Sequence, residues 1–206
     1  FFHNLYLPIC YLTRRTVFTI PTRSYTIANM ARHSELVKIP RIDRYITKLA
    51  LGTAPLGGLF TSVADSEAEA TILAAVDAGI NYFDTAPLYG YGVAEKRLGS
   101  ALNKSGKPFV LSTKVGRILE KIDPNRSVID DSLGSFADND PSVVPVFDFS
   151  REGILRSIED SLKRLNVSSF DIAYIHDADE RIGEAIEKSY GVLDELRSQG
   201  VIKGIG

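Results

Sequence analysis

The sequence of 206 residues is poor in the side chains that build covalent cross-links and metal centres. Its single cysteine, Cys10, excludes an internal disulfide, and with only three histidines the sequence argues against a structural zinc site. No apolar run approaches the ~20 residues that span a bilayer, so no membrane association is expected. The formal net charge of −2 provides no bulk basic surface for nucleic acid. With 44% hydrophobic residues, the composition is that of an ordinary globular protein.

Acidic residues are absent from Phe1 to Ser34, where four arginines occur: Arg14, Arg15, Arg23 and Arg32. One interpretation is a mitochondrial presequence, which has this composition. The alternative, which we favour, is that Met30, the only methionine, is the true start of a cytoplasmic protein, and that residues 1–29 are translated leader or a gene-model error. In both cases residues 1–45 are expected to form a poorly ordered N-terminal extension outside the core.

Short apolar stretches alternate with amphipathic helical patterns over residues 46–206. The expected strands cover residues 48–53, 81–83, 109–113, 171–175 and, as the opening of a fifth strand, 201–206. The expected helices cover residues 66–78, 94–102, 151–165 and 182–198. This alternation predicts an α/β fold with a parallel sheet. A closed TIM (β/α)8 barrel needs eight strands and ~250 residues. The sequence therefore predicts an incomplete barrel with about five of the eight strands, and we expect strands six to eight to be missing.

Residues 117–149 show no helical or strand period. They contain seven acidic and three basic side chains, and Asp, Ser, Asn and Pro are frequent. A structureless loop of this length is usually either functional or disordered. We therefore expect a lid over a pocket, a disordered insertion, or a lid with a disordered middle.

Three of the expected strands end on a titratable residue: Asp84, Lys114 and His176. Tyr89 follows Asp84 by five residues, on a turn that contains Pro87. In a parallel α/β protein the carboxyl ends of all strands lie on one face, where sites are built. We therefore expect the four side chains of Asp84, Tyr89, Lys114 and His176 to converge.

The first strand closes on Gly52 and Thr53, which have little side-chain bulk, so a planar ligand could approach the backbone there. No G-x-G-x-x-G follows this strand, and no G-x-x-x-x-G-K-[ST] occurs in the chain. Neither Rossmann nor P-loop phosphate binding is therefore supported.

Four segments carry a resemblance to a known family: Phe83-Asp84-Thr85-Ala86-Pro87-Leu88-Tyr89-Gly90, Glu95-Lys96-Arg97-Leu98-Gly99, Ser112-Thr113-Lys114 and Ile175-His176-Asp177. In this order and spacing they resemble the aldo-keto reductase family, over residues 46–206. Within the family, residues 52–58, residues 114–117 and the His176-Asp177 pair resemble the branch of aldose, L-fucose and L-galactose dehydrogenases.

The resemblance implies an NAD(P)-dependent oxidoreductase that transfers a hydride between a nicotinamide and a sugar hemiacetal or carbonyl. Tyr89 is then the general acid/base, Lys114 the cation beside it, and Asp84 the ion-pair partner of Lys114. The resemblance makes His176 the residue that hydrogen-bonds the substrate oxygen and helps to relay the proton. An unperturbed tyrosine titrates near pH ~10, and a nearby cation favours the phenolate.

The resemblance also implies that Gly52, Thr53 and Asp84 contact the cofactor, and that no metal is required. Arg117 and Asp177 are weaker candidates, for substrate or cofactor contact and for orienting the histidine. The family positions that distinguish NAD from NADP lie beyond the last residue of this chain, so the choice of cofactor stays open.

Two alternatives remain. A lysine at the end of a barrel strand can act as a nucleophile, so Lys114 could serve a Schiff-base aldolase. The chain could also be a truncated non-catalytic or regulatory member of the family.

Overall fold

The computed structural model describes residues 33–122 and 136–206. All of them belong to the second of two compact units, Ala31–Gly206. Residues 1–32 of the expected extension and residues 123–135 of the expected loop lie outside the described residues.

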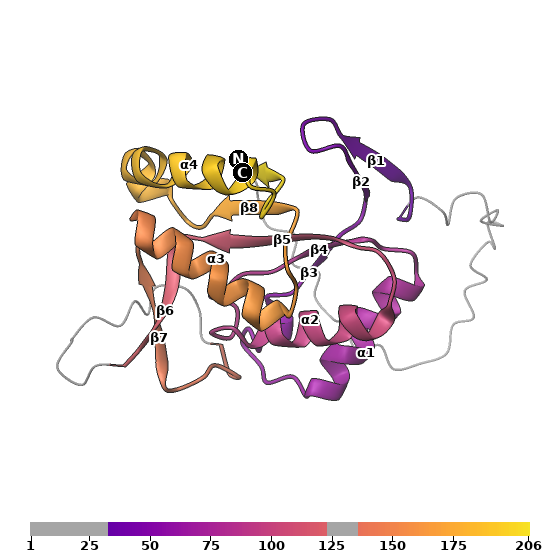
Figure 1. Cartoon of the computed structure of the whole chain (residues 1–206). Helices are drawn as coiled ribbons and strands as arrows, with labels where there is room; N and C mark the ends of the chain where they lie inside the picture. The colour runs from indigo at the N-terminus through magenta and orange to yellow at the C-terminus, as the bar shows by residue number, and fades with distance from the viewer. Residues whose placement is uncertain (1–32, 123–135) are drawn as a thin grey trace, which may run out of the picture. The chain divides into compact units, whose positions relative to one another are not determined.

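Five strands form one parallel sheet, in the spatial order β3-β4-β5-β8-β9 (Figure 1). The strands are β3 (Leu51–Gly52), β4 (Tyr82–Asp84), β5 (Val110–Val115), β8 (Ile172–Ile175) and β9 (Gly204–Ile205). They lie in the sheet in the same order as in the chain, as the early strands of a barrel do. The predicted parallel α/β fold with five strands is confirmed.

One long helix lies between each consecutive pair of these strands in the chain. The helices are α1 (Asp65–Asp77), α2 (Val93–Ser105), α3 (Arg151–Leu165) and α4 (Ile182–Ser198), with short 3-10 turns η2 (Pro55–Gly57) and η3 (Asp179–Arg181). The two ends of α3 illustrate how the sequence determines where a helix starts and stops. The Ser150 hydroxyl caps α3 by accepting from the Gly153 N–H at 3.1 Å, and Asn166 ends it in the left-handed conformation. Each helix of residues 33–122 and 136–206 is too short or too polar to cross a bilayer.

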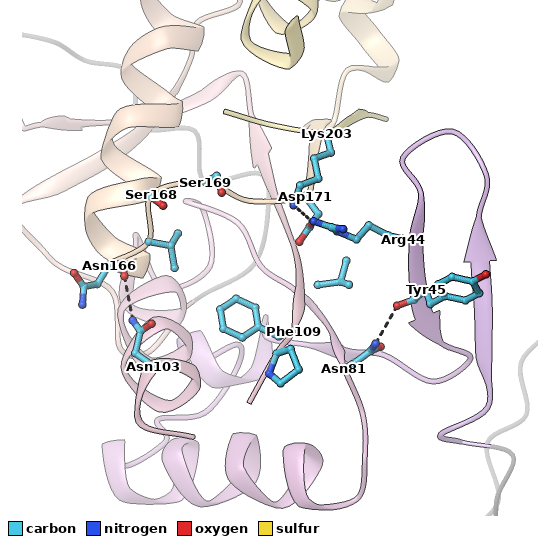
Figure 2. Close-up of a pocket in the computed structure, with 13 residues that line it drawn as sticks. Arg44, Tyr45, Asn81, Asn103, Phe109, Asn166, Ser168, Ser169, Asp171 and Lys203 are labelled. Atoms are coloured by element: carbon cyan, nitrogen blue, oxygen red, sulfur yellow. Dashed lines mark hydrogen bonds and ion pairs between the residues drawn. The ribbon is translucent and has the colours of Figure 1, made fainter. Parts of the chain in front are cut away.

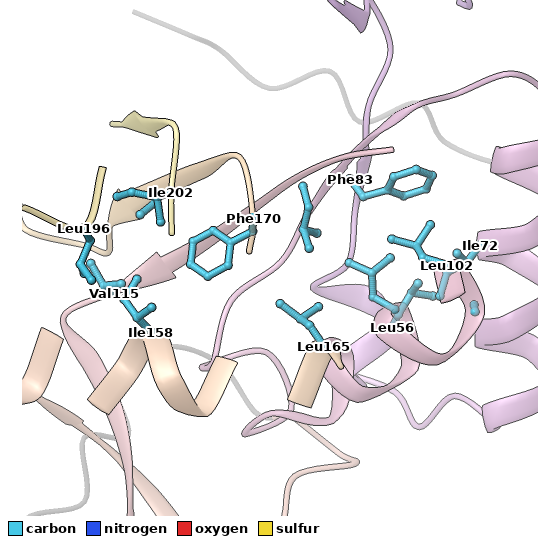
Figure 3. Close-up of a cluster of buried hydrophobic side chains, with 14 of the residues drawn as sticks. Leu56, Ile72, Phe83, Leu102, Val115, Ile158, Leu165, Phe170, Leu196 and Ile202 are labelled. Atoms are coloured by element: carbon cyan, nitrogen blue, oxygen red, sulfur yellow. The ribbon is translucent and has the colours of Figure 1, made fainter. Parts of the chain in front are cut away.

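The hydrophobic core lies between the sheet and the helices (Figure 3). Phe83 on β4 and Leu111 on β5 are register partners, and both are fully buried in this core. Because side chains alternate along a strand, their neighbours Asp84 and Ser112 point to the opposite face. The helices thus hold one face of the sheet, and the polar residues share the other.

A hairpin of β1 (Leu36–Ile39) and β2 (Arg44–Thr47) lies within the region expected to be a poorly ordered extension. It is attached to the sheet, because Arg44 Nε lies 2.8 Å from Asp171 Oδ1 and the Asn81 side chain accepts from the Thr47 N–H at 2.7 Å. Residues 33–45 therefore differ from the expectation made for residues 1–45. Arg44, which was expected to lie in the extension, has the buried Asp171 as its partner.

A second hairpin, β6 (Arg117–Lys121) with β7 (Val143–Phe147), occupies the two ends of the 117–149 segment. This segment was expected to be a structureless loop. The β-branched and aromatic residues of Val143–Phe147 fit a strand. The neighbouring proline and aspartates concealed that pattern.

Candidate active site

The carboxyl ends of the strands place the predicted site residues side by side. Gly52 is the register partner of Asp84, and Asp84 is the partner of Ser112. Lys114 is paired with Tyr174, and the His176 N–H donates to the Val115 carbonyl at 2.9 Å. Asp84, Lys114 and His176 therefore lie at one edge of the sheet, as the strand pattern predicted.

Lys114 is the centre of this group. Its ammonium donates to Asp84 Oδ2 at 2.6 Å and to the Thr85 carbonyl at 2.9 Å. The same nitrogen lies 4.8 Å from the centroid of the Tyr89 ring. Because the lysine side chain is only 15% exposed, this charge is held largely away from water, where its field on the tyrosine is strong.

The second carboxylate oxygen of Asp84 is held by a residue that sequence reasoning did not select. The Ser112 hydroxyl donates to Asp84 Oδ1 at 2.6 Å and lies 3.1 Å from the Tyr82 hydroxyl, which lies 3.4 Å from the Tyr174 hydroxyl. Burial raises the pKa of the Tyr82 phenol well above its ordinary value. Asp84 is therefore hydrogen-bonded to a chain of three hydroxyl groups, those of Ser112, Tyr82 and Tyr174.

His176 lies against Tyr89, with ring centroids 6.0 Å apart and ring planes at 89°. Burial, together with the charges of Lys114 and Arg117, lowers the pKa of His176 to about 3, against the opposing effect of Asp84. The imidazole is therefore neutral near pH 7. Its Nε2 lies 3.4 Å from Asp177 Oδ2, and its buried Nδ1 has no hydrogen-bond partner among the described residues. A buried polar atom without a partner is costly, and a substrate hydroxyl or carbonyl could relieve that cost.

Arg117 and Asp177, the weaker candidates, lie beside the histidine. Arg117 is buried, its guanidinium nitrogen Nη2 lies 3.3 Å from Asp177 Oδ2, and its Cζ lies 4.0 Å from the Phe147 ring centroid. Asp177 has a left-handed backbone with φ of 45°. The pair therefore joins the β6–β7 hairpin to the turn after β8.

The Tyr89 turn is held by a close backbone contact. A Cβ at Gly57 would come 2.6 Å from the Tyr89 carbonyl carbon, and Gly90 has φ of 62° and also approaches the Gly57 backbone. Only glycine allows the two backbones to come this close, so Gly57 and Gly90 determine where the Tyr89 turn lies.

Gly52 and Thr53 differ in what they offer a ligand. Gly52 is exposed, and no heavy atom lies within 4 Å of the position that its Cβ would take. Thr53 is fully buried, and its hydroxyl donates to the Asp84 carbonyl at 3.1 Å. The open space beside Gly52 could accept a flat ring next to Asp84, whereas the Thr53 side chain is already used within the sheet.

Comparison with known proteins identifies the family. Residues 48–206 match the model of the aldo/keto reductase family. The chain belongs to this family. It is 40% identical to pyridoxal 4-dehydrogenase from Microbacterium luteolum, over 84% of this chain and 55% of that protein. It is 41% identical to D-threo-aldose 1-dehydrogenase from a Pseudomonas species, over 78% of this chain and 49% of that protein.

One solved structure and a further curated relative agree with this assignment. A glycerol dehydrogenase from Gluconobacter oxydans superposes with a TM-score of 0.62 at 31% identity, over 84% of this chain and 48% of that one. L-galactose dehydrogenase from Arabidopsis thaliana is 31% identical, over 78% of this chain and 44% of that protein. This aldo/keto reductase chain thus spans about half the length of the curated relatives it matches.

A pocket of about 810 Å³ lies at the opposite, amino end of the strands (Figure 2). Its charged residues surround Asp171, which accepts from Arg44 at 2.8 Å, from Lys203 at 2.6 Å and from the Leu111 N–H at 3.0 Å. Burial would raise the pKa of Asp171, but the hydrogen bonds from Lys203, Arg44 and Leu111 outweigh it and lower the pKa. Because the Asp171 carboxylate accepts from two cations and a backbone N–H, we interpret this end of the aldo/keto reductase sheet as structural.

Metal ligands are not grouped in the described parts of the chain. Across residues 33–122 and 136–206, no three His, Cys, Asp or Glu side chains lie close enough to hold an ion.

Proposed function

We propose that this chain carries the catalytic side chains of an NAD(P)-dependent oxidoreductase, which transfers a hydride between a nicotinamide, NADP or NAD, and a sugar hemiacetal or carbonyl carbon. One observation carries the proposal. The Lys114 ammonium is held by Asp84 at 2.6 Å and lies 4.8 Å from the Tyr89 ring centroid. A tyrosine beside a buried, anchored cation is suited to gain and lose a proton.

Each side chain has one role in this reaction. In oxidation Tyr89 accepts the proton of the anomeric hydroxyl, and in reduction it returns one to the carbonyl oxygen. Lys114 stabilises the negative charge that develops on the phenol oxygen. Asp84 orients the lysine. The neutral imidazole of His176 hydrogen-bonds the substrate oxygen and keeps it beside the tyrosine, because the two ring centroids lie 6.0 Å apart.

The cofactor supplies the hydride acceptor or donor when it is bound. Gly52 leaves space for a flat ring at the carboxyl end of β3. Asp84 lies on the next strand, so a ring in that space is adjacent to the proton-transfer group. The names of the relatives, D-threo-aldose 1-dehydrogenase, L-galactose dehydrogenase and pyridoxal 4-dehydrogenase, support a sugar or another small aldehyde as the substrate.

The test is a turnover assay on the complete protein. We expect formation of reduced nicotinamide with D-threo-aldoses, L-galactose or pyridoxal, in the presence of NAD⁺ or NADP⁺. Tyr89→Phe should lower kcat by about 10²- to 10⁴-fold without unfolding the protein, because it removes the acid/base group alone. Tyr190→Phe is the matched control, since Tyr190 is 51% exposed on α4 and should leave kcat unchanged. Equal activity of Tyr89→Phe and the parent protein would refute the role of Tyr89.

The alternatives give different results. A Schiff-base aldolase needs a lysine whose nitrogen is free to attack a carbonyl, but the Lys114 nitrogen already donates to Asp84 at 2.6 Å and to the Thr85 carbonyl at 2.9 Å. Trapping of a substrate on Lys114 by borohydride would nevertheless support that alternative. Binding of reduced nicotinamide without any turnover would support a non-catalytic family member.

A further inference from the structure

The segment Phe136–Asp138, from the region between β6 and β7, packs onto the loop between η2 and α1. Phe136 forms an antiparallel bridge with Leu59, and the Ala137 N–H donates to the Gly58 carbonyl at 2.8 Å. Gly58 has φ of 83°, and a Cβ there would come 2.7 Å from the Asp138 nitrogen. The two backbones therefore touch directly, which only a glycine at position 58 allows.

Asp138 fastens the segment to this loop. Its carboxylate accepts from the Ser62 hydroxyl, from the Val63 N–H at 2.9 Å and from Arg97 Nη1 at 3.0 Å. Hydrogen bonds from Ser62 and Val63 lower the pKa of Asp138 to about 2, with a further contribution from Arg97 and against the effect of burial. The carboxylate is therefore charged throughout the neutral range.

Arg97 on α2 is the other half of this fastening. Besides Asp138, it donates to the Leu56 carbonyl at 2.6 Å, to the Val63 carbonyl at 2.8 Å and to Asp65. Its side chain is only 11% exposed, and that of Asp138 is 13% exposed. Because both charges are largely removed from water and their hydrogen-bonding atoms are occupied, the pair is more than a surface salt bridge.

The segment Phe136–Asp138, held in place by Asp138, positions Phe136 at the candidate active site. The Phe136 ring is 7% exposed, and its centroid lies 6.2 Å from that of Tyr89 and 6.4 Å from that of Tyr91. The Tyr89 ring thus has Lys114, His176 and Phe136 around it. Lys114 lies on β5 and His176 directly follows β8, whereas Phe136 comes from the region between the hairpin strands.

We propose that Asp138 and Arg97 form a latch that holds Phe136 against Tyr89, and that Phe136 is a positioning residue for the proposed acid/base. The latch fixes the Tyr89 ring between the lysine and the histidine, so that its hydroxyl stays in line with the substrate oxygen. Misplacement of a reacting group by about 1 Å can cost 10²-fold in rate, so a small movement of this ring is sufficient to matter. This role rests on the proposed function, but the latch itself does not.

Hydrogen exchange tests the latch without any activity. In the complete protein, the Ala137 amide should be protected, and Asp138→Ala should make it exchange at least about 10-fold faster. The control is Asp77→Ala, which removes an ion pair to Lys107 from an aspartate that is 76% exposed. It should leave exchange at Ala137 unchanged. Unchanged exchange at Ala137 in Asp138→Ala would overturn the latch.

A second variant guards against misfolding of the first. These 206 residues contain no tryptophan, so Phe136→Trp adds a fluorescent reporter at the contact. We expect blue-shifted emission and weak acrylamide quenching for Phe136→Trp, and a red shift with stronger quenching when Asp138→Asn is added. Equal quenching in the two proteins would contradict the latch.

Turnover tests the positioning role separately. Phe136→Ala should lower kcat by about 10-fold or more and leave KM for the nicotinamide cofactor unchanged, and Phe136→Leu should restore part of kcat. A lower exchange protection with unchanged kcat would keep the latch and remove the positioning role. If the parent protein shows no turnover at all, the proposed function fails while the exchange result still decides the latch.

Discussion

The two ends of the five-stranded sheet each hold an aspartate paired with a lysine, and the surroundings of the two pairs differ. At the amino end, Asp171 has two cations and a backbone N–H as donors. At the carboxyl end, Asp84 holds Lys114, whose charge also lies near the aromatic ring of Tyr89. The first pair is complete within the protein. In the second pair, the lysine charge lies beside the ring of Tyr89, the proposed acid/base.

The unpartnered atoms show the same difference. Among the described residues, the buried Nδ1 of His176 lacks a partner at the carboxyl end, whereas the Asp171 oxygens are bonded. A pocket of about 810 Å³ nevertheless lies at the amino end. We therefore place the candidate site by incomplete hydrogen bonding and by charge beside a titratable group, and not by cavity size.

The largest expected effects come from two substitutions, one at each end of the sheet, with activity and stability measured for both. Lys114→Met should lower kcat by about 10²-fold or more, because it removes the charge beside Tyr89. Asp171→Asn should instead lower the free energy of unfolding by about 2 kcal/mol, a value reduced because Arg44 and Lys203 are each about a third exposed or more. Urea unfolding and steady-state kinetics of both variants measure the two effects.

The outcome of this test should be specific to each end. Asp171→Asn should retain kcat within about twofold at temperatures where it is folded, since breaking a structural pair leaves the reacting groups in place. A large loss of kcat in Asp171→Asn at full folding would erase the distinction between the two ends.

The pH dependence of the unfolding free energy in acid is a second test of the comparison, with an expected effect of intermediate size. The pKa of His176 is lowered to about 3, so between pH ~6.5 and ~3 the unfolded histidine binds a proton that the folded one does not. Stability therefore falls as the pH drops through this window, by at most about 1.4 kcal/mol per pH unit. The Asp171 contribution is present above pH ~3.9 and is lost only below it, because its pKa is also lowered.

Unfolding free energies of the parent protein and His176→Gln, measured from neutral to acid pH, separate the two contributions. The variant should lose the slope above pH ~4 and keep the loss below it, since the second belongs to carboxylates with lowered pKa values, among them Asp171 and Asp138. An identical slope in both proteins between pH ~6.5 and ~4 would show that His176 is not the group that titrates.

Much of the sheet could be predicted because its signals are local. The strands before Asp84, Lys114 and His176 are short apolar runs between turns, and a parallel sheet gathers their ends at one edge. Ser112 could also have been found, because it precedes Lys114 by two residues and must share its face of the strand. The same period links Tyr82 to Asp84.

Other parts depend on contacts that no local pattern encodes. Phe136 reaches Tyr89 through the pairing of Asp138 with Arg97, residues that are 41 positions apart in the chain. Arg44 was assigned to an extension, yet its partner Asp171 lies 127 positions away. Sequence reading from a single chain gives the residue types in such pairs but not the pairing itself, because loop closure is decided by tertiary packing.

The smallest expected effect concerns the hydroxyl beneath Asp84. Ser112→Ala removes the hydrogen bond of 2.6 Å to Asp84 Oδ1 and should cost about 1 kcal/mol of stability. It should also lower kcat by about threefold to tenfold, because a loosened carboxylate orients Lys114 less well. Ser189→Ala is the matched control: its buried hydroxyl donates to the Phe149 carbonyl at 3.2 Å, away from Asp84. Both variants should lose similar stability in urea, and only Ser112→Ala should lose turnover. Equal kcat values for the two would mean that the Asp84–Lys114 pair does not depend on the Ser112 hydroxyl. The positions of the strand ends alone would then be enough to arrange the site residues at the carboxyl end.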